Sequence, residues 1–482
     1  MSFLPRGYAC FSRPILYLLV GTLLALSLGL YADENKNTAL SKQLKPVIFS
    51  EVQGIAWVQK CVEQYPEILW LADAKVRKTE EGQATMQSPY SEQLFGQKFI
   101  EFDRTIMTLH CLQLILNGSE NAYQKFTAAQ PSDTKLSRAS FEKLHSQGTT
   151  LVKSNYEGMS KWEMTQAMEA ALVLGDIGKS ERARAVFKPH DASAPDHDDF
   201  HEEVMRILEQ YPHLCPTFDR LTPPAKKLLQ STANLVHYGH VTHIEGGPSM
   251  FSKLKQSGLS SALPEAVAFD FFVHTCDVAG ALGHVNNQSS LVYTELSHRA
   301  MQAVADACSV LADSESSEVD AYNAYLAIRA GWLGLNPEDR TDRTLTRIGA
   351  MLRLFTPEDG LLLKKSILKL EPEQRAKIIE QLDTKEELAR TPTYMPAVLV
   401  NLSNNPQLGA LREERIAQAV VLGLPFLSRV LEAHKRSLEE HEANPDIPLN
   451  FNKAAGVAKQ SPTALLNGFS IDSEGNVCCV SE

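Results

Sequence analysis

The fold is decided by the stretch Ala170-Ala171-Leu172-Val173-Leu174-Gly175-Asp176-Ile177-Gly178-Lys179, where an apolar helix ends at a glycine and a carboxylate follows at once. Upstream, Met164, Met168 and Leu172 recur at helical spacing, which predicts that this helix has a buried face. Asp176 comes one turn after the most apolar part of that face. Burial of a carboxylate is unfavourable unless a cation binds it, so we expect Asp176 to form a salt bridge or to bind a metal.

Helical periodicity extends along the chain from Phe49 onward. Apolar residues recur at spacings of three and four without sustained alternation, which predicts an all-α fold. The clearest helical segments are residues 55–76, 92–116, 161–174, 200–210, 225–243, 301–311 and 366–382. After the Pro-rich break at residues 188–199, we expect a helix from Phe200 with Asp198 or Asp199 as its N-cap.

The composition is that of a globular protein with a large core. The chain has 482 residues, of which 44% are hydrophobic and 22% charged, enough for two or three domains. The net charge is −11 and no concentrated basic face is visible, which argues against nucleic acid as the main partner. The eight cysteines show no CxxC spacing, so we expect mostly buried thiols and no zinc knuckle.

The N-terminal region contains an uncharged apolar stretch over residues 15–32, preceded by Arg13 and followed by Asp33. Its length is close to the roughly 20 residues that span a bilayer, so we predict a single membrane span. A signal peptide cleaved after Ala32 is the alternative. Basic residues flank the stretch on both sides and leave its orientation undetermined.

The rest of the chain divides by composition. We expect a basic flank over residues 1–14, a polar tether over 33–48, a helical domain over 49–333, a C-terminal helical region over 334–450 and an irregular tail over 451–482.

Two histidine-containing segments follow the opening stretch. His197 and Asp198 form a doublet, and His201 shares a helical face with His197 if the helix begins early enough. An imidazole and a carboxylate together suit Mn, Fe, Zn or Mg, whereas a solvated acidic loop is the structural alternative.

The second segment contains His237, His240 and His243. Its spacing of three lets adjacent histidines pair on one helical face but spreads the outer two apart.

A further segment contains His274 and Asp277 inside an apolar helix, where they must pair or bind something. The alternative is a buried His–Asp hydrogen bond in a helix that crosses another through Ala279, Gly280, Ala281 and Gly283. His145 precedes all of these segments on a predicted helix.

The order of these residues over positions 140–285 resembles the HD-domain superfamily of helical, metal-dependent phosphohydrolases. The family pattern is a leading His, a His-Asp doublet in a phrase like HDIGK, one or two further His and a closing Asp. The matching phrase here is Gly175-Asp176-Ile177-Gly178-Lys179, with Gly175 in place of the doublet histidine. The resemblance implies an HD-like helical bundle.

The resemblance also implies a function: a membrane-anchored phosphohydrolase that holds a divalent metal (Mn, Fe, Mg or Zn) and acts on a phosphomonoester or phosphodiester through metal-bound water. It implies catalytic roles for Lys179, His201 and His237. It implies metal ligation by His145, Asp176, His197, Asp198, His240, His243, His274 and Asp277. Two alternatives are a non-catalytic HD-like module that binds a metal or nucleotide, favoured by Gly175, and a helical scaffold without a site. The sequence does not indicate an oligomeric state.

Overall fold

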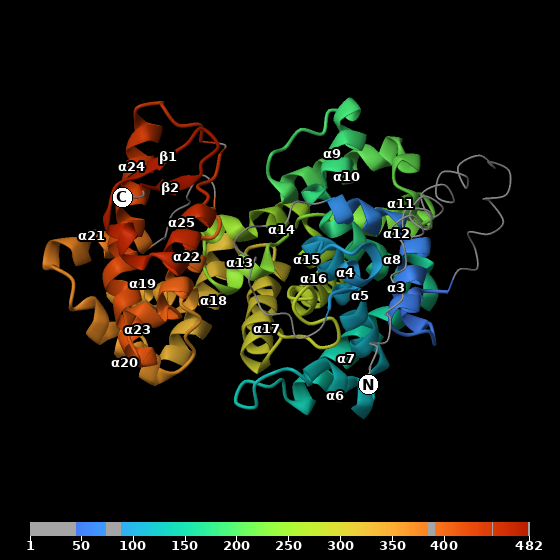
Figure 1. Cartoon of the computed structure of the whole chain (residues 1–482), viewed down its shortest axis with the longest axis horizontal. Coiled ribbons are helices and arrows are strands. Elements are labelled where there is room, and N and C mark those ends of the chain that lie inside the picture. Colours follow the sequence, from blue (N-terminus) through green and yellow to red (C-terminus); the bar gives the residue numbers. More distant parts are fainter. Residues whose placement is uncertain (1–44, 74–87, 384–390, 446, 481–482) are drawn as a thin grey trace, which may run out of the picture. The chain divides into compact units, whose positions relative to one another are not determined.

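The computed structural model describes residues 45–73, 88–383, 391–445 and 447–480 (Figure 1). Within these ranges the chain forms 23 α-helices and only two strands of three residues each, so the predicted all-α fold is confirmed. The predicted span at residues 15–32 and the basic flank at residues 1–14 lie outside the described residues.

The first half of the described chain is helical throughout. Its elements are η2 (Val47–Phe49), α3 (Ile55–Gln64), η3 (Pro66–Asp73), α4 (Tyr90–Phe95), α5 (Ile100–Asn117), α6 (Glu120–Thr127), α7 (Arg138–Lys153), η5 (Tyr156–Gly158), α8 (Lys161–Gly175), η6 (Ile177–Lys179), α9 (Glu181–Phe187), η7 (Lys188–His190), α10 (His197–Gln210), η8 (Pro212–Leu214), α11 (Pro216–Asp219) and α12 (Pro223–Thr232).

The second half adds a short hairpin to further helices. Its elements are α13 (Tyr238–Thr242), η9 (Pro248–Phe251), α14 (Ser252–Ser257), α15 (Leu259–Ala262), α16 (Pro264–Gly280), α17 (Glu295–Ser309), η10 (Val310–Ala312), α18 (Glu318–Leu333), α19 (Arg340–Met351), α20 (Pro357–Ile367), α21 (Pro372–Leu382), α22 (Met395–Ser403), η11 (Pro406–Leu408), α23 (Arg412–Gln418), the π-helical η12 (Ala419–Gly423), α24 (Leu424–Glu439), α25 (Asn452–Gln460), η13 (Pro462–Leu466), β1 (Phe469–Ile471) and β2 (Val477–Cys479). The strands pair antiparallel, with Ser470 opposite Cys478.

The chain forms two compact units that are interleaved in sequence. Unit 1 consists of Met1–Ala129, Leu144–Gln230 and Ala279–Val292, and unit 2 consists of Gln130–Lys143, Ser231–Val278 and Tyr293–Glu482. The predicted boundary at residue 334 therefore lies inside unit 2. The predicted tail at residues 451–482 contains α25 and the hairpin.

Helix α5 is the centre of unit 1. Phe102, Ile106 and Leu109 are fully buried on it, and even its Asp103 and Thr108 are buried. A helix that is buried on nearly all sides needs close neighbours, and glycines provide them. A Cβ on Gly280 would lie 2.5 Å from the backbone nitrogen of Thr108, and one on Gly283 would lie 2.4 Å from the carbonyl oxygen of Asp103. These two contacts agree, at Gly280 and Gly283, with the small-residue crossing that was the alternative interpretation of this segment.

The core of unit 2 surrounds α22, whose Val398, Leu399 and Leu402 are fully buried. Against it packs the continuous helical stretch Arg412–Glu439, in which the π-helical turn brings Gly423 against Leu399. This stretch is long and apolar enough to cross a membrane, but 61% of its most apolar window is buried inside the protein. It is accordingly a core helix of unit 2.

Several predicted helix boundaries are wrong. The segments predicted over residues 92–116 and 366–382 are each divided between two helices, α4 and α5 in the first case and α20 and α21 in the second. Helix α10 begins at His197 and not at Phe200, because Asp196 is its N-cap and accepts hydrogen bonds from the backbone N–H groups of Asp198 and Asp199. The predicted helix over residues 225–243 is two helices, α12 and α13, and Asn234 in the connection has a left-handed φ of 61°.

Candidate metal centre

The site in unit 1 is built on the turn after α8. Helix α8 ends at Gly175, Asp176 is its C-cap, and η6 carries Lys179 back over the carboxylate. Lys179 Nζ lies 2.7 Å from Asp176 Oδ1 and 3.2 Å from Glu101 Oε2 on α5. Arg104 completes the group with a 3.2 Å ion pair to Glu101. Asp176 therefore has the salt-bridge partner that its position requires.

Charge, and not burial, controls ionisation in this group. Burial alone would raise the pKa of Asp176, but the Lys179 ammonium and then the Arg104 guanidinium hold that pKa well below its ordinary value. Burial would likewise lower the pKa of Lys179, and Asp176 raises it instead. Both groups are charged near neutral pH.

The start of α10 lies directly against this turn. A Cβ on Gly178 would be 2.5 Å from the carbonyl oxygen of His197, so only a glycine permits the approach. His197 is close enough to contribute to the lowered pKa of Asp176. The tertiary fold thus brings the Gly175–Lys179 phrase and the His197-Asp198 doublet together.

Asp196, His197 and Asp198 form a compact set of metal-ligand types at the start of α10. One ligand atom from each residue lies within 4.8 Å of the other two. His197 Nε2 lies 3.3 Å from Asp198 Oδ1, and all three side chains are half-buried. Asp196 was missed from the sequence, although its position directly before the doublet was a usable signal.

His201 is fixed by the end of α8. Its Nδ1 donates a hydrogen bond to the carbonyl oxygen of Leu174 at 3.0 Å, which places the proton on Nδ1 in the neutral ring. Since His197 and His201 are four residues apart in α10, they share a face, as the sequence predicted.

His145 lies at the end of α5 in unit 1 and binds the backbone there. Its Nδ1 donates to the carbonyl oxygen of Ile115 at 2.9 Å, in the last turn of α5. Its ring also lies where a Cβ of Gly118 would be, 2.4 Å from Nδ1. His145 therefore caps the C-terminus of α5, and this contact accounts for its place in the fold.

The predicted residues after position 230 belong to unit 2. His237 is the N-cap of α13, and its ring stacks on that of His240 with centroids 5.3 Å apart. His240 Nδ1 lies 3.3 Å from Glu245 Oε2. Burial raises the pKa of Glu245, and the neighbouring His240 partly opposes that rise. The predicted pairing of adjacent histidines is confirmed for His237 and His240.

His243 lies beside cationic side chains. Burial lowers its pKa well below the ordinary value, and Arg353 and Arg329 lower it further. The loop after it is held by Arg347, a fully buried guanidinium that donates to the carbonyl oxygens of Ile244 and Glu245 at 3.0 and 2.6 Å. His243 is therefore neutral near neutral pH.

His274 pairs with Asp270, a residue that sequence reasoning missed. His274 Nδ1 lies 3.3 Å from Asp270 Oδ1, one helical turn away in α16, and Tyr238 Oη donates to Asp270 Oδ2 at 2.8 Å. Burial would lower the pKa of His274, but Asp270 and more weakly Asp277 raise it to about 9. An aspartate one turn before a histidine in an apolar helix was the available signal.

The eleven predicted residues thus form two groups. The residues of unit 1 are His145, Asp176, Lys179, His197, Asp198 and His201. The residues of unit 2 are His237, His240, His243, His274 and Asp277. Within unit 1 the structure gathers Asp176, Lys179, His197 and Asp198 and adds Glu101, Arg104 and Asp196 to them.

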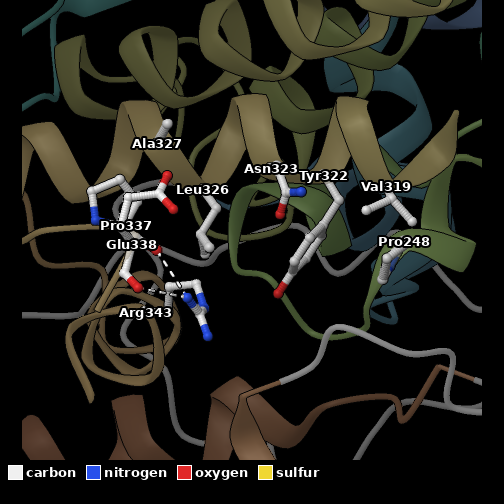
Figure 2. A pocket seen from close by; sticks show the side chains of 9 residues that line it. All are labelled: Pro248, Val319, Tyr322, Asn323, Leu326, Ala327, Pro337, Glu338 and Arg343. Carbon is white, nitrogen blue, oxygen red and sulfur yellow. Dashed lines mark hydrogen bonds between the residues drawn. The ribbon is translucent and has the colours of Figure 1, made fainter. Parts of the chain in front are cut away.

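Unit 2 also contains a cavity of about 280 Å³, which Figure 2 shows. One face of α18 lines it with Tyr322, Asn323 and Leu326, opposite Arg343. Arg343 is neutralised by Asp383 at 2.9 Å and donates to the carbonyl oxygens of the Pro337-Glu338 turn. No sequence-predicted site residue lines this cavity.

The comparison with protein families finds one family model that covers most of the chain. A family model described as a family of unknown function (DUF6829) matches residues 58–454. The chain belongs to this family. The DUF6829 match includes parts of both units and all eleven predicted residues. No curated protein and no solved structure matches the chain.

Proposed function

We propose that this DUF6829 protein is a divalent-metal-dependent phosphohydrolase whose metal is bound in unit 1 by Asp196, His197 and Asp198. The proposal depends on one observation: the three donor atoms lie within 4.8 Å of one another, directly beside the Asp176–Lys179 turn. The HD-like order of residues in the sequence supports the same class of reaction.

The donor set fits a transition metal. Ligands at about 2.1 Å from a metal and at right angles to each other are about 3.0 Å apart, close to the 3.3 Å between His197 Nε2 and Asp198 Oδ1. One imidazole and two carboxylates suit Mn, Fe or Zn, and the carboxylates also suit Mg. In this proposal His197 and Asp198 supply the His-Asp doublet that Gly175 interrupts.

The cations beside the donors suit an anionic substrate. A bound divalent metal supplies an activated water and polarises a phosphoryl oxygen. Lys179 and Arg104, which are ion-paired with Asp176 and Glu101, lie next to the donors, where they would offset charge that develops on a phosphoester. His201, whose Nδ1 donates to the carbonyl oxygen of Leu174 and which shares a face of α10 with His197, would help to orient a water or a phosphate hydroxyl.

Metal binding is tested by titrating Mn²⁺ into EDTA-treated full chain and measuring the heat. We expect one saturable site whose affinity falls at least about tenfold in Asp198→Asn and His197→Ala. Asp199→Asn is the matched control, since it removes the same charge from the same helical turn outside the donor triplet. Equal losses of Mn²⁺ affinity in Asp198→Asn and Asp199→Asn would contradict the site, because they would mean that the acidic residues attract Mn²⁺ without the donor triplet binding it.

Catalysis is tested with p-nitrophenyl phosphate and bis(p-nitrophenyl) phosphate as probes. We expect Mn²⁺-dependent release of p-nitrophenol that is lost in Asp198→Asn and retained in Asp199→Asn. Absence of turnover on both probes, with metal binding intact, would refute the hydrolase.

One observation favours a second candidate, a non-catalytic metal-binding module. The Asp176 carboxylate, which the HD pattern uses as a ligand, is held by Lys179 at 2.7 Å. For such a module we expect Mn²⁺ to raise the melting temperature of unit 1 without turnover on either probe.

A further inference from the structure

A second cavity in unit 2 is lined by three arginines. It encloses about 290 Å³ and opens to solvent, with Arg353, Arg412 and Arg415 around it. Ser403 and Asn404 add polar groups to the wall. The apolar part of the wall consists of Leu352, Leu354, Val400 and Ile416.

Positive charge is in excess at this cavity. Arg412 Nη1 forms an ion pair of 2.8 Å with Asp359. Arg415 donates to backbone carbonyl oxygens only, those of Ser403, Gly409 and Ala410, at 2.9–3.3 Å. Across the described ranges, the pair with Asp359 is the one ion pair that these three arginines make. The lining therefore carries three guanidinium groups against two nearby carboxylates, Asp359 beside Arg412 and Glu245 beside Arg353.

Arg353 occupies a position where a glycine is the usual residue. It follows the C-cap of α19 in a Schellman motif: the N–H of Arg353 bonds the carbonyl of Ala350 at 3.0 Å, and the N–H of Leu354 bonds that of Gly349 at 2.8 Å. This motif needs a left-handed backbone, and Arg353 adopts it with φ of 57°. The chain thus places an arginine at a strained position whose side chain lines the cavity.

The side chain of Arg353 makes no hydrogen bond or ion pair within the part of the chain that the structure describes, although it is partly desolvated, which lowers its pKa, and the Glu245 carboxylate is near enough to oppose that shift. Arg412 and Arg415, in contrast, are oriented by their own partners. The guanidinium groups of Arg412 and Arg415 are held in fixed orientations, and that of Arg353 has its N–H donors available. An anion in the cavity could accept hydrogen bonds from all three.

We propose that this cavity binds a small phosphate-bearing anion, either inorganic phosphate or a phosphomonoester. Guanidinium forks match phosphate oxygens in bidentate geometry. Arg412 and Arg415 belong to the first turns of the continuous helical stretch that begins at Arg412, so both guanidinium groups reach the cavity from one element. The volume of about 290 Å³ is at the lower limit of ligand pockets, which favours a compact ligand. The apolar wall would contact the organic part of an ester. The site contains no residue of the metal centre and is independent of the hydrolase proposal.

The test is calorimetric titration of EDTA-treated full chain with inorganic phosphate and, separately, with glycerol 3-phosphate, at low salt. We expect one saturable site and a loss of affinity of at least about tenfold in Arg353→Asn and Arg353→Gly. Both substitutions suit the left-handed backbone, so the melting temperature should not fall. Tighter binding of the ester than of phosphate would identify the ester as the ligand, and equal binding would identify phosphate itself.

Arg436→Gln is the matched control. Arg436 lies about 36 Å from Arg412 along the same helical stretch and is 65% exposed. We expect it to bind phosphate like the unaltered chain, and Asp198→Asn in the metal centre to do so as well. Absence of saturable binding, or an equal loss in Arg436→Gln and Arg353→Asn, would overturn the site. A loss in Asp198→Asn alone would place the phosphate at the metal centre and also overturn it.

Discussion

Lys179 Nζ lies between two carboxylates, 2.7 Å from Asp176 Oδ1 and 3.2 Å from Glu101 Oε2. One ammonium group therefore connects the end of α8 to α5, the most buried helix of unit 1. In the proposed metal site, the same contact would limit how much of the Asp176 carboxylate a metal could reach.

Lys179→Met should lower the free energy of unfolding by about 3 kcal/mol near pH 7, because it leaves a half-buried carboxylate without its main partner. The pKa of Asp176 is depressed in the folded protein, so this stabilisation is present above the ordinary pKa of an aspartate and is lost as the pH falls. The loss measured by urea unfolding should shrink toward acidic pH. The double variant with Asp176→Asn should cost less than the two single variants summed, and strict additivity would contradict the pairing.

Gly175→His restores the doublet of the HD pattern and should increase the affinity for Mn²⁺ about tenfold or more. A Cβ on Gly175 meets nothing within 4 Å, so the backbone accepts a side chain there. Histidine also has a higher helix propensity than glycine. Gly175→Ala is the control, since it makes the same backbone change without the imidazole. Equal affinities for Mn²⁺ in the two variants would mean that a side chain at position 175 does not reach the metal.

Glu169→Gln should flatten the fall in stability between about pH 4.5 and pH 8. Glu169 is fully buried, accepts from the backbone N–H of Ile48 at 2.9 Å and from Tyr65 Oη, and burial raises its pKa to about 8. Between about pH 4.5 and 8 the unfolded chain ionises this group and the folded chain does not. Stability therefore declines with rising pH, by at most about 1.4 kcal/mol per pH unit from this residue.

The measurement for Glu169 is the slope of unfolding free energy against pH, from urea titrations at several pH values. The control is Glu142→Gln, an exposed glutamate in α7, for which the slope of the unaltered chain should persist. An unchanged slope in Glu169→Gln would mean that the carboxyl is ionised in the folded state.

Gly280→Ala should destabilise unit 1 by about 1–3 kcal/mol, because its methyl group would lie 2.5 Å from the backbone nitrogen of Thr108. Gly331→Ala is the matched control in a helix with open space around the Cβ, and it should be neutral or slightly stabilising. Thermal unfolding of the two variants distinguishes them. Equal effects would place Gly280 further from Thr108 than the structure does.

Asp270→Asn should lower the pKa of His274 from about 9 to below 6.5, because burial is then opposed only by the weaker effect of Asp277. In the unaltered chain the raised pKa contributes stability that is complete below pH 6.5 and is lost as the pH rises through 9. NMR titration of the imidazole C–H signal measures both pKa values. Glu265→Gln, at the exposed start of α16, should leave the His274 titration unchanged.

The helical class could be predicted from sequence because helical periodicity is local. The spacing of residues predicted the buried face of α8, the close approach at Gly280 and Gly283, and the burial of most cysteines. Helix ends were less legible, since capping by Asp196 and the break near Asn234 depend on hydrogen bonds and backbone angles at single residues.

What the sequence by itself determined is an all-α chain and a short inventory of residues capable of acid, base or metal chemistry. What only the tertiary structure decided is which of them meet. Asp176 meets Lys179 and the start of α10, whereas His274 pairs with Asp270 in the other unit. The reason is physical: periodicity records which face of a helix is buried, but partners from distant segments are selected by packing among helices, which no local spacing encodes.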